Sequence, residues 1–240
     1  MSASYEIIDP SLDPRLNAFG QPIGKPVPDW AGCQRPPDVE LTGRTCRLVP
    51  YHPDHAASLF DACAADDGRM WTYMPFGPFA DAAALNASIM NYQANKGFQT
   101  FVVLADARAI GYLSFMRHDL VNGSVEVGGV TFSPALQRST VATEAQYLMM
   151  KHAFGHGYRR YEWKCDQLNG PSNRAALRLG FQFEGIFRNA VVYKDRRRDT
   201  CWYAIIIEDW PAVRARLEAW LDPGNFDADG TQRRPLKATL

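Results

Sequence analysis

Residues 137–142, QRSTVA, combine an arginine with small hydroxyl residues at a point where a helix start could bind an anion. The stretch before them has the composition of a strand, and EAQYLMMKHAF after them has that of a helix. The first amides of a helix lack intrahelical acceptors and lie at the positive end of its dipole, so Arg138, Ser139 and Thr140 could complete an anion site. The same stretch also suits simple capping, with Ser139 or Thr140 as N-cap and Glu144 in the first turn.

Composition narrows the class of ligand. The 240 residues include 26 Lys plus Arg and 26 Asp plus Glu, so no net charge draws the protein to nucleic acid or to an anionic membrane. The junction at 137–142 lacks the GxxxxGK[ST] and GxGxxG patterns of loops that bind nucleoside triphosphates and dinucleotides. We therefore expect a local site, not the overall charge, to recognise the partner. Neither nucleic acid nor a membrane is an expected partner.

Cysteine spacing and the N-terminus indicate the compartment. The five cysteines are odd in number and form no CxxC or CxxH pair, which argues against a disulfide framework and a zinc site, so no metal is expected. The N-terminal MSASYEIIDPSLDPR lacks a basic region followed by an apolar one, and no stretch approaches the ~20 apolar residues of a membrane span. These features predict a cytoplasmic protein.

Alternating strands and helices are expected to hold the junction in place. Hydrophobic periodicity predicts strands at 45–51, 98–106, 109–120, 124–134, 159–166, 183–193 and 200–207. It predicts helices at 54–66 with Asp54 as N-cap, 81–96, 140–154, 169–181 and 208–221. Apolar residues cover most of helix 140–154, so it is central, and the strands flanking it must be parallel because a crossover joins them. The predicted fold class is α/β (α+β), a mixed sheet of about six to seven strands flanked by helices.

The two ends of the chain differ in composition from its middle. Seven prolines lie between Asp9 and Pro37, a density that excludes regular helix and central strand. We therefore expect residues 1–40 to form a proline-rich extension, residues 41–221 the folded domain, and residues 222–240 a loose C-terminal tail.

Downstream of QRSTVA the chain carries an ordered series of short motifs. They are ATEA at the start of the central helix, HAF at its end, Asp166, Asn169 and Ser172 ahead of LGF (179–181), EG (184–185), Arg188 and EDW (208–210). QRSTVA itself follows the loop pattern Q/R-x-x-G-x-G/A, except that Thr140 occupies the glycine position. From about Gly43 to Leu221 the sequence resembles the GCN5-related N-acetyltransferase (GNAT) superfamily, and within it the RimJ/RimL-type branch of ribosomal-protein alanine and serine N-acetyltransferases.

The resemblance implies an acyltransferase that moves the acetyl group of acetyl-CoA directly to a primary amine, either a protein N-terminus or a small molecule. Acetyl-CoA would lie in a wedge between splayed parallel strands at 128–132 and 162–166. Acetyl-CoA and the amine acceptor would be the partners, and a homodimer is a further expectation. The alternative is a catalytically inactive GNAT-fold module with an acyl-CoA-binding or regulatory role. Thr140 raises this alternative, because glycine is favoured where backbone approaches a ligand closely.

The same resemblance implies residue roles. The pantetheine arm would contact Val130, Thr131, Phe132 and Asn169. The diphosphate would bind at Gln137, Arg138, Ser139, Thr140, Val141, Ala142 and Thr143. Ser172 would donate a hydrogen bond to the leaving thiolate. Asn169 and Ser172 also suit ordinary loop and helix capping.

The proton acceptor has one first candidate, Glu126. Its strand enters the wedge, so its carboxylate could act as a base through a water, or it could equally be a solvent-facing charge on an alternating strand. Glu144 and Glu184 are weaker candidates. An aromatic group would lie near the acceptor side or simply pack together: Trp71, Tyr73, Phe76 and Phe79.

Overall fold

The computed structural model describes residues 15–237, and by internal contacts the chain divides into residues 1–31 and 32–240. The first unit contains a small antiparallel hairpin of β1 (Arg15–Leu16) and β2 (Pro22–Ile23). The prolines exclude regular helix and central strand, and this hairpin contains neither. Each strand of a two-stranded sheet is an edge strand, where proline is tolerated.

Residues 32–40 group with the larger unit by internal contacts. They are held by backbone acceptors and donors: the Cys33 amide donates to the Leu120 carbonyl at 2.9 Å, and Gln99 Nε2 donates to the Pro36 carbonyl at 2.8 Å. Such long-range pairing of loop backbone leaves no periodic signal in the sequence. The outermost parts of the predicted extension and tail, residues 1–14 and 238–240, lie outside the described residues.

The larger unit is built on an eight-stranded mixed sheet in the order β3-β4-β5-β6-β7-β8-β10-β9. Its strands are β3 (Leu41–Thr42), β4 (Arg47–Pro50), β5 (Gln99–Ala105), β6 (Arg108–Asp119), β7 (Ser124–Phe132), β8 (Arg160–Asp166), β9 (Gln182–Tyr193) and β10 (Arg196–Ile206). The pairing of β7 with β8 is parallel and all other neighbours are antiparallel, which confirms the predicted mixed sheet. The strand beyond the predicted seven is β3, whose two residues are too few to show a period.

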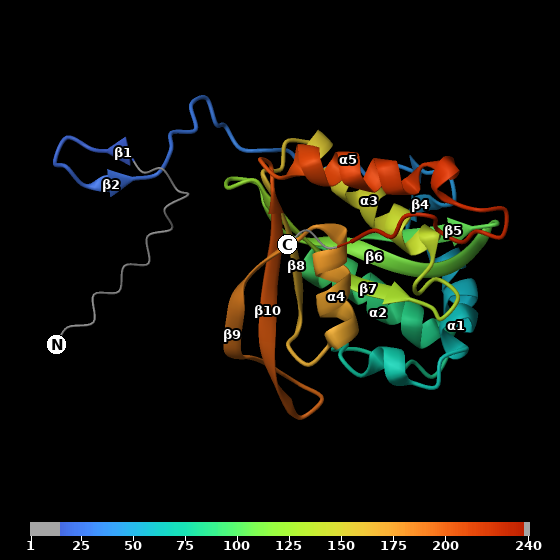
Figure 1. Ribbon diagram of the computed structural model, residues 1–240. Coiled ribbons are helices and arrows are strands. Elements are labelled where there is room, and N and C mark those ends of the chain that lie inside the picture. The colour runs from blue at the N-terminus through green and yellow to red at the C-terminus, as the bar shows by residue number, and fades with distance from the viewer. Residues whose placement is uncertain (1–14, 238–240) are drawn as a thin grey trace. The chain divides into compact units, whose positions relative to one another are not determined.

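Within residues 15–237, five α-helices cover the sheet on both faces (Figure 1). They are α1 (Ala56–Ala64) and α2 (Ala82–Lys96) on one face, and α3 (Thr140–Gly155), α4 (Gly170–Leu179) and α5 (Trp210–Leu221) on the other. Strand alternation divides the core accordingly: Val102 packs with α1 and α2, while Phe101 and Val103 pack with α3. Among residues 15–237, no helix has the length and apolar content to cross a membrane.

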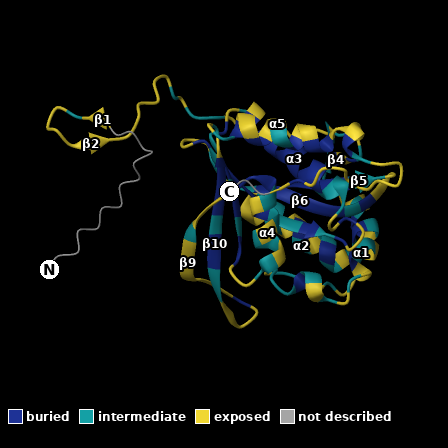
Figure 2. Ribbon diagram, in the orientation of Figure 1, coloured by how far each residue is buried: buried dark blue, intermediate teal, exposed yellow. Residues whose placement is uncertain are grey.

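Helix α3 is the central helix that its sequence predicts. Eleven of its residues are buried, including the polar Glu144 and Gln146, and Figure 2 shows it dark between the sheet and α5. The predicted cap of α1 is wrong. Asp54 lies in a short 3-10 turn, η2 (Pro53–His55), and α1 begins only after His55, because Pro53 starts a tight turn one step earlier.

The described part of the C-terminal segment, residues 222–237, packs on α5 and so differs from the loose tail that its composition predicts. Asn225 is 1% exposed, and its Nδ2 donates to the carbonyls of Trp220 at 2.9 Å and Arg234 at 3.1 Å. The ring of Phe226 packs edge-on against that of Trp220, with centroids 5.2 Å apart. The buried Asn225 and the Trp220–Phe226 contact supply ordering that a count of polar residues does not reveal.

Candidate functional site

Strands β7 and β8 are paired along only part of their length. Their parallel register runs from Ser124 opposite Arg160 to Val127 opposite Trp163, and it stops there. Beyond that point β7 pairs only with β6, and β8 pairs only with β10. The two strands diverge in Figure 1, so the backbone groups that face the gap have no strand partner across it and are available to a ligand.

A bulge lies where the two strands separate. The β6–β7 register shifts between Tyr112 and Ser114, and Gly129 in β7 has a left-handed φ of 57°. Next to it, a Cβ added to Gly128 would lie 2.2 Å from Met116 Sδ. The backbone conformation favours glycine at position 129, whereas a side chain at position 128 would have to displace Met116.

The start of α3 has the geometry of a capped helix terminus. Thr140 is its first residue, and the N-cap Ser139 accepts a hydrogen bond through Oγ from the Ala142 amide at 3.0 Å. The left-handed conformation in this loop falls on Arg138, with φ 58°, whereas Thr140 is helical. Thr140 thus does not occupy a conformation that needs glycine.

Other side chains of the loop support its shape. Gln137 Nε2 donates to the Phe132 carbonyl at 2.9 Å, and the buried Thr143 hydroxyl accepts from Arg178 Nη2 at 2.8 Å. Val141 and Ala142 are half-buried against the core. Of the residues predicted at the diphosphate, Arg138 is the exposed cation.

The second half of β7 offers mainly backbone to the gap. Val130 and Phe132 are half-buried and pack against the core on the α3 side. Thr131 is 2% exposed, and its hydroxyl donates to the Gly129 carbonyl at 3.1 Å. These three predicted pantetheine residues are therefore consecutive along one edge of the gap.

Asn169 and Ser172 lie together at the start of α4. Asn169 is its N-cap, and its Oδ1 accepts from the Ser172 amide at 3.1 Å, so the capping role is realised. Ser172 Oγ accepts from Trp163 Nε1 at 3.0 Å. Because the indole occupies an acceptor lone pair, the hydroxyl hydrogen of Ser172 stays available for donation.

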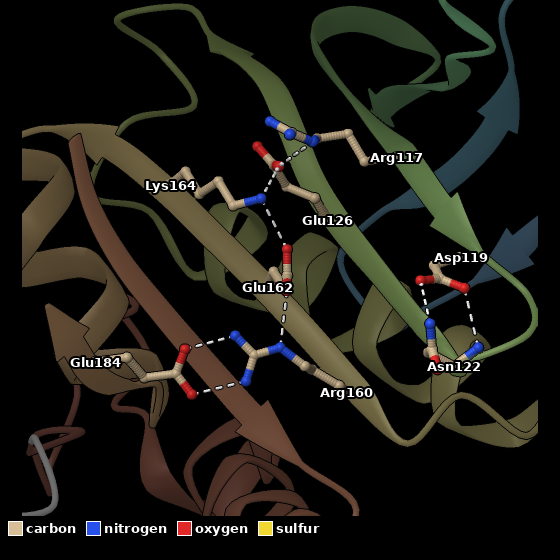
Figure 3. A network of polar contacts seen from close by, with 8 residues as sticks. All are labelled: Arg117, Asp119, Asn122, Glu126, Arg160, Glu162, Lys164 and Glu184. Carbon is tan, nitrogen blue, oxygen red and sulfur yellow. Dashed lines mark hydrogen bonds and ion pairs between the residues drawn. The ribbon is translucent and has the colours of Figure 1, made fainter. Parts of the chain in front are cut away.

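Glu126 lies on the opposite face of the sheet from Ser172. Its neighbours Val125 and Val127 belong to the core on the α3 side, so its own side chain points toward the other face. It is 6% exposed, with Oε2 2.9 Å from Lys164 Nζ and 3.7 Å from Arg117 Nε (Figure 3). Burial raises the pKa of Glu126, and the two cations partly oppose this. The solvent-facing alternative for Glu126 is therefore wrong.

The two weaker candidate bases are engaged in structural bonds. Glu144 accepts from the amides of Arg44 at 2.7 Å and Thr45 at 2.6 Å, and so holds the turn between β3 and β4 against α3. Glu184 accepts from Arg160 Nη1 at 2.7 Å. Neither arrangement leaves a carboxylate directed at the gap between β7 and β8.

A small pocket of about 250 Å³, including space open to solvent, lies between α2 and the sheet. Its walls include the aromatic residues Phe76, Tyr92 and Phe98 and the hydroxyls of Ser88, Thr100 and Ser114, and it reaches the bulge at Gly129. Phe76 belongs to the aromatic group that the resemblance places near the acceptor side or in simple packing. Trp71 and Phe79 pack around it with ring centroids 6.2 Å away, and Tyr73 is half-buried in the same loop. Ser88 and Tyr92 were missed, although their i,i+4 spacing on a predicted helix places them on one face.

The tip of the β9–β10 hairpin reaches the loop that follows α1. Lys194 Nζ donates to the Trp71 carbonyl and Arg196 Nη2 to the Thr72 carbonyl, each at 2.8 Å. The basic run 194–199 is thus partly engaged within the fold rather than fully solvated, which its charge alone does not indicate.

Residues 46–182 match the profile described as the acetyltransferase (GNAT) domain. The chain belongs to the GNAT acetyltransferases. The crystal structure of a GCN5-related N-acetyltransferase from Brucella melitensis matches this chain with a TM-score of 0.83. The two sequences are 38% identical, and the match covers 88% of this chain and 97% of that one. The GNAT fold that the sequence predicts is confirmed, and the protein is an acyltransferase.

Two further matches lie in or near the branch that the sequence resembles. The ribosomal-protein-serine acetyltransferase of Escherichia coli is 31% identical over 108 residues, or 45% of this chain and 60% of that protein. Mycobacterium smegmatis RimJ, solved in complex with CoA-disulfide, is 19% identical with a TM-score of 0.62, covering 75% of this chain and 90% of that one, and shows the common fold alone. The similarity to the ribosomal-protein-serine acetyltransferase supports the RimJ/RimL-type resemblance.

Proposed function

We propose that this GNAT enzyme transfers the acetyl group of acetyl-CoA directly to a primary amine. The observation that carries the proposal is the end of β7–β8 pairing at Val127 and Trp163, with Ser172 on one side of the sheet and Glu126 on the other. This arrangement supports entry of the thioester from the α3 side and of the amine from the α2 side. The CoA-disulfide complex of the RimJ relative supports the same choice of donor.

The residues at the gap suit acetyl-CoA. The unpaired backbone of residues 128–132 suits the amides of a pantetheine arm, with the Asn169 side-chain amide as a further donor. The first turn of α3, with Arg138 beside it, suits a diphosphate because free amides and a cation converge there. Because the side chains of Gln137 and Thr143 are already hydrogen-bonded within the protein, their role is to shape the loop.

The protein's own groups then have separate tasks. When bound, acetyl-CoA supplies a thioester carbonyl that a neutral amine can attack. Glu126, with its raised pKa, accepts the proton of the incoming ammonium, directly or through a water. Ser172, oriented by Trp163, donates its hydroxyl hydrogen toward the leaving sulfur. The backbone at the gap holds the reacting groups in line.

Calorimetric titration with acetyl-CoA, followed by turnover assays with amines, tests this proposal. We expect one-to-one binding that weakens in Arg138→Ala and Asn169→Ala, and turnover that falls in Ser172→Ala and Glu126→Gln. Unchanged rates in Asn169→Ala and Ser172→Ala would remove these site assignments. Binding without turnover of any amine would instead favour the inactive acyl-CoA-binding module.

For the acceptor we propose a protein N-terminus, with small-molecule amines as the alternative. The support is the similarity to the ribosomal-protein-serine acetyltransferase, whose name states such an acceptor. A panel of peptides that differ at the first residue, assayed beside simple amines, distinguishes the two classes. The cytoplasmic location, the homodimer and the division at residues 40 and 221 stay predictions from the sequence.

A further inference from the structure

Six charged side chains of alternating sign form a chain across β6, β7, β8 and β9 (Figure 3). In order they are Arg117, Glu126, Lys164, Glu162, Arg160 and Glu184. Lys164 lies at its centre, with Nζ 2.9 Å from Glu126 Oε2 and 2.8 Å from Glu162 Oε2. The proposed base is thus part of an extended network.

Lys164 is closely confined. Its side chain is 6% exposed, and its Nζ lies 3.6 Å from the centroid of the Trp202 ring, so the ring covers the ammonium on one side. A desolvated cation over an indole is held by the negative face of the ring. Trp202 in turn packs on Phe187, with ring centroids 4.5 Å apart. A buried lysine can persist only with such partners, since removing it from water is costly.

The two carboxylates beside Lys164 have unequal surroundings. Glu126 and Glu162 are directly opposite in the parallel register, and both contact Lys164. Glu162 has a second close partner, Arg160 Nε at 2.7 Å, whereas the second partner of Glu126 is Arg117, which is 59% exposed and 3.7 Å away. Burial would raise the pKa of Glu162, but hydrogen bonds from Lys164 and Arg160 lower it. Burial does raise the pKa of Glu126. Paired carboxylates with pKa values pushed apart are typical of acid and base assignments.

Glu126 is also held at a defined place. A Cβ added to Gly128 would lie 3.4 Å from Glu126 Oε1, so the carboxylate stands over Gly128, directly beyond the last β7–β8 pair. The side-chain charges that face it are Lys164 and Glu162 from β8 and Arg117 from β6. Of these, only Lys164 is both buried and of opposite charge.

We infer that Lys164 is a positioning residue that holds Glu126 at the start of the gap and sets the pH at which Glu126 can accept a proton from the acceptor amine. This inference rests on the proposed function, in which Glu126 is the base. Lys164 shares its charge between Glu126 and Glu162. Removing the charge of Lys164 therefore raises the pKa of Glu126, whereas removing the charge of Glu162 lowers it.

The test is the pH dependence of kcat/KM for amine acetylation. In Lys164→Met the carboxylate of Glu126 loses its close cation, so we expect the acid limb to move to higher pH by about one unit or more. In Glu162→Gln the negative charge opposite Glu126 is removed and Lys164 pairs with Glu126 alone. We therefore expect the acid limb of the pH profile to move to lower pH. Lys164→Arg keeps the charge and should keep the limb near its original position even if kcat falls. Arg117→Gln, at an exposed site, is the matched control and should move the limb less than Lys164→Met.

Glu126→Gln separates failure of this inference from failure of the proposed function. If Glu126→Gln keeps the acid limb, Glu126 is not the base and the proposed function loses its proton acceptor. If Glu126→Gln abolishes the limb while Lys164→Met and Glu162→Gln leave it in place, Glu126 is the base and the role of Lys164 is overturned. Should Lys164→Met fail to fold by circular dichroism, the shift in Glu162→Gln decides alone.

Discussion

The orientation of Ser172 depends on one indole. Trp163 Nε1 donates to Ser172 Oγ at 3.0 Å, and Trp163 is itself held in the core on the α3 side. Trp163→Phe keeps most of the packing and removes this donor, so we expect kcat to fall about three- to tenfold, equivalent to roughly 1 kcal/mol. The KM for acetyl-CoA should change little. In a Ser172→Ala background the same substitution should have no further effect on kcat, and an undiminished effect there would show that Trp163 acts by another route.

At the scale of single residues, the sequence could identify candidates but not their partners. Glu126 is a candidate from its strand and Ser172 from the family resemblance. Their surroundings depend on Lys164 and Trp163 of β8, and a local sequence pattern does not reveal these contacts. Alternation predicts that Lys164 faces away from Trp163. It does not predict that a tryptophan on β10 would cover the lysine.

The turn between β3 and β4 is fastened to α3 by Glu144. Its carboxylate accepts from the Arg44 and Thr45 amides and from the Thr45 hydroxyl, and a Cβ on Gly43 would collide with it. Glu144→Ala leaves these donors without their partner, so we expect the free energy of unfolding to fall by about 2 to 4 kcal/mol. Urea denaturation measures the change. Glu208→Gln, at an exposed position, is the control, and equal small losses in both variants would contradict the fastening role.

The start of α3 allows a direct test of the missing glycine. Thr140 has helical backbone, so Thr140→Gly relieves no backbone strain and slightly weakens the helix. We expect the affinity for acetyl-CoA to stay within about threefold of the original protein, by calorimetry, with a slightly lower melting temperature. An affinity increase of tenfold or more would show that the threonine side chain crowds the diphosphate.

At the scale of elements, strongly periodic segments were predictable and short or tertiary-dependent ones were not. The alternating strands and α2, predicted at 81–96, follow from local sequence. The two-residue β3 exists because β4 and the Glu144 contact hold it beside the sheet, and the hairpin tip at Lys194 is placed by a carbonyl of a distant loop. Such elements depend on contacts between segments far apart in the sequence.

At the scale of the whole molecule, a half-buried histidine links stability to pH. His118 Nδ1 lies 2.6 Å from the Tyr158 hydroxyl, and burial, with a contribution from Arg35, lowers the pKa of His118 to about 4. An unfolded histidine has a pKa near ~6.5, so between these values the unfolded chain binds more protons. Stability from this group is therefore complete above about pH 6.5 and declines as pH falls toward 4.

We expect His118→Gln to reduce this dependence. Urea denaturation at several pH values between 7 and 4 should show the two proteins converging as pH falls, because only the original protein loses the contribution of a neutral His118. The convergence should amount to no more than about 3 kcal/mol. Parallel curves over the whole range would show that His118 is not the group responsible.

The ion chain from Arg117 to Glu184 contains three cations and three carboxylates, of which Glu126, Glu162 and Lys164 are largely withdrawn from water. A neutral substitution of Lys164 leaves the buried carboxylate of Glu126 without its close cation, which is strongly unfavourable. We therefore expect these positions to be substituted together during evolution. Among GNAT relatives we expect a lysine equivalent to Lys164 to be lost together with a carboxylate opposite it, and retained where both carboxylates remain, a pattern that a family alignment can count.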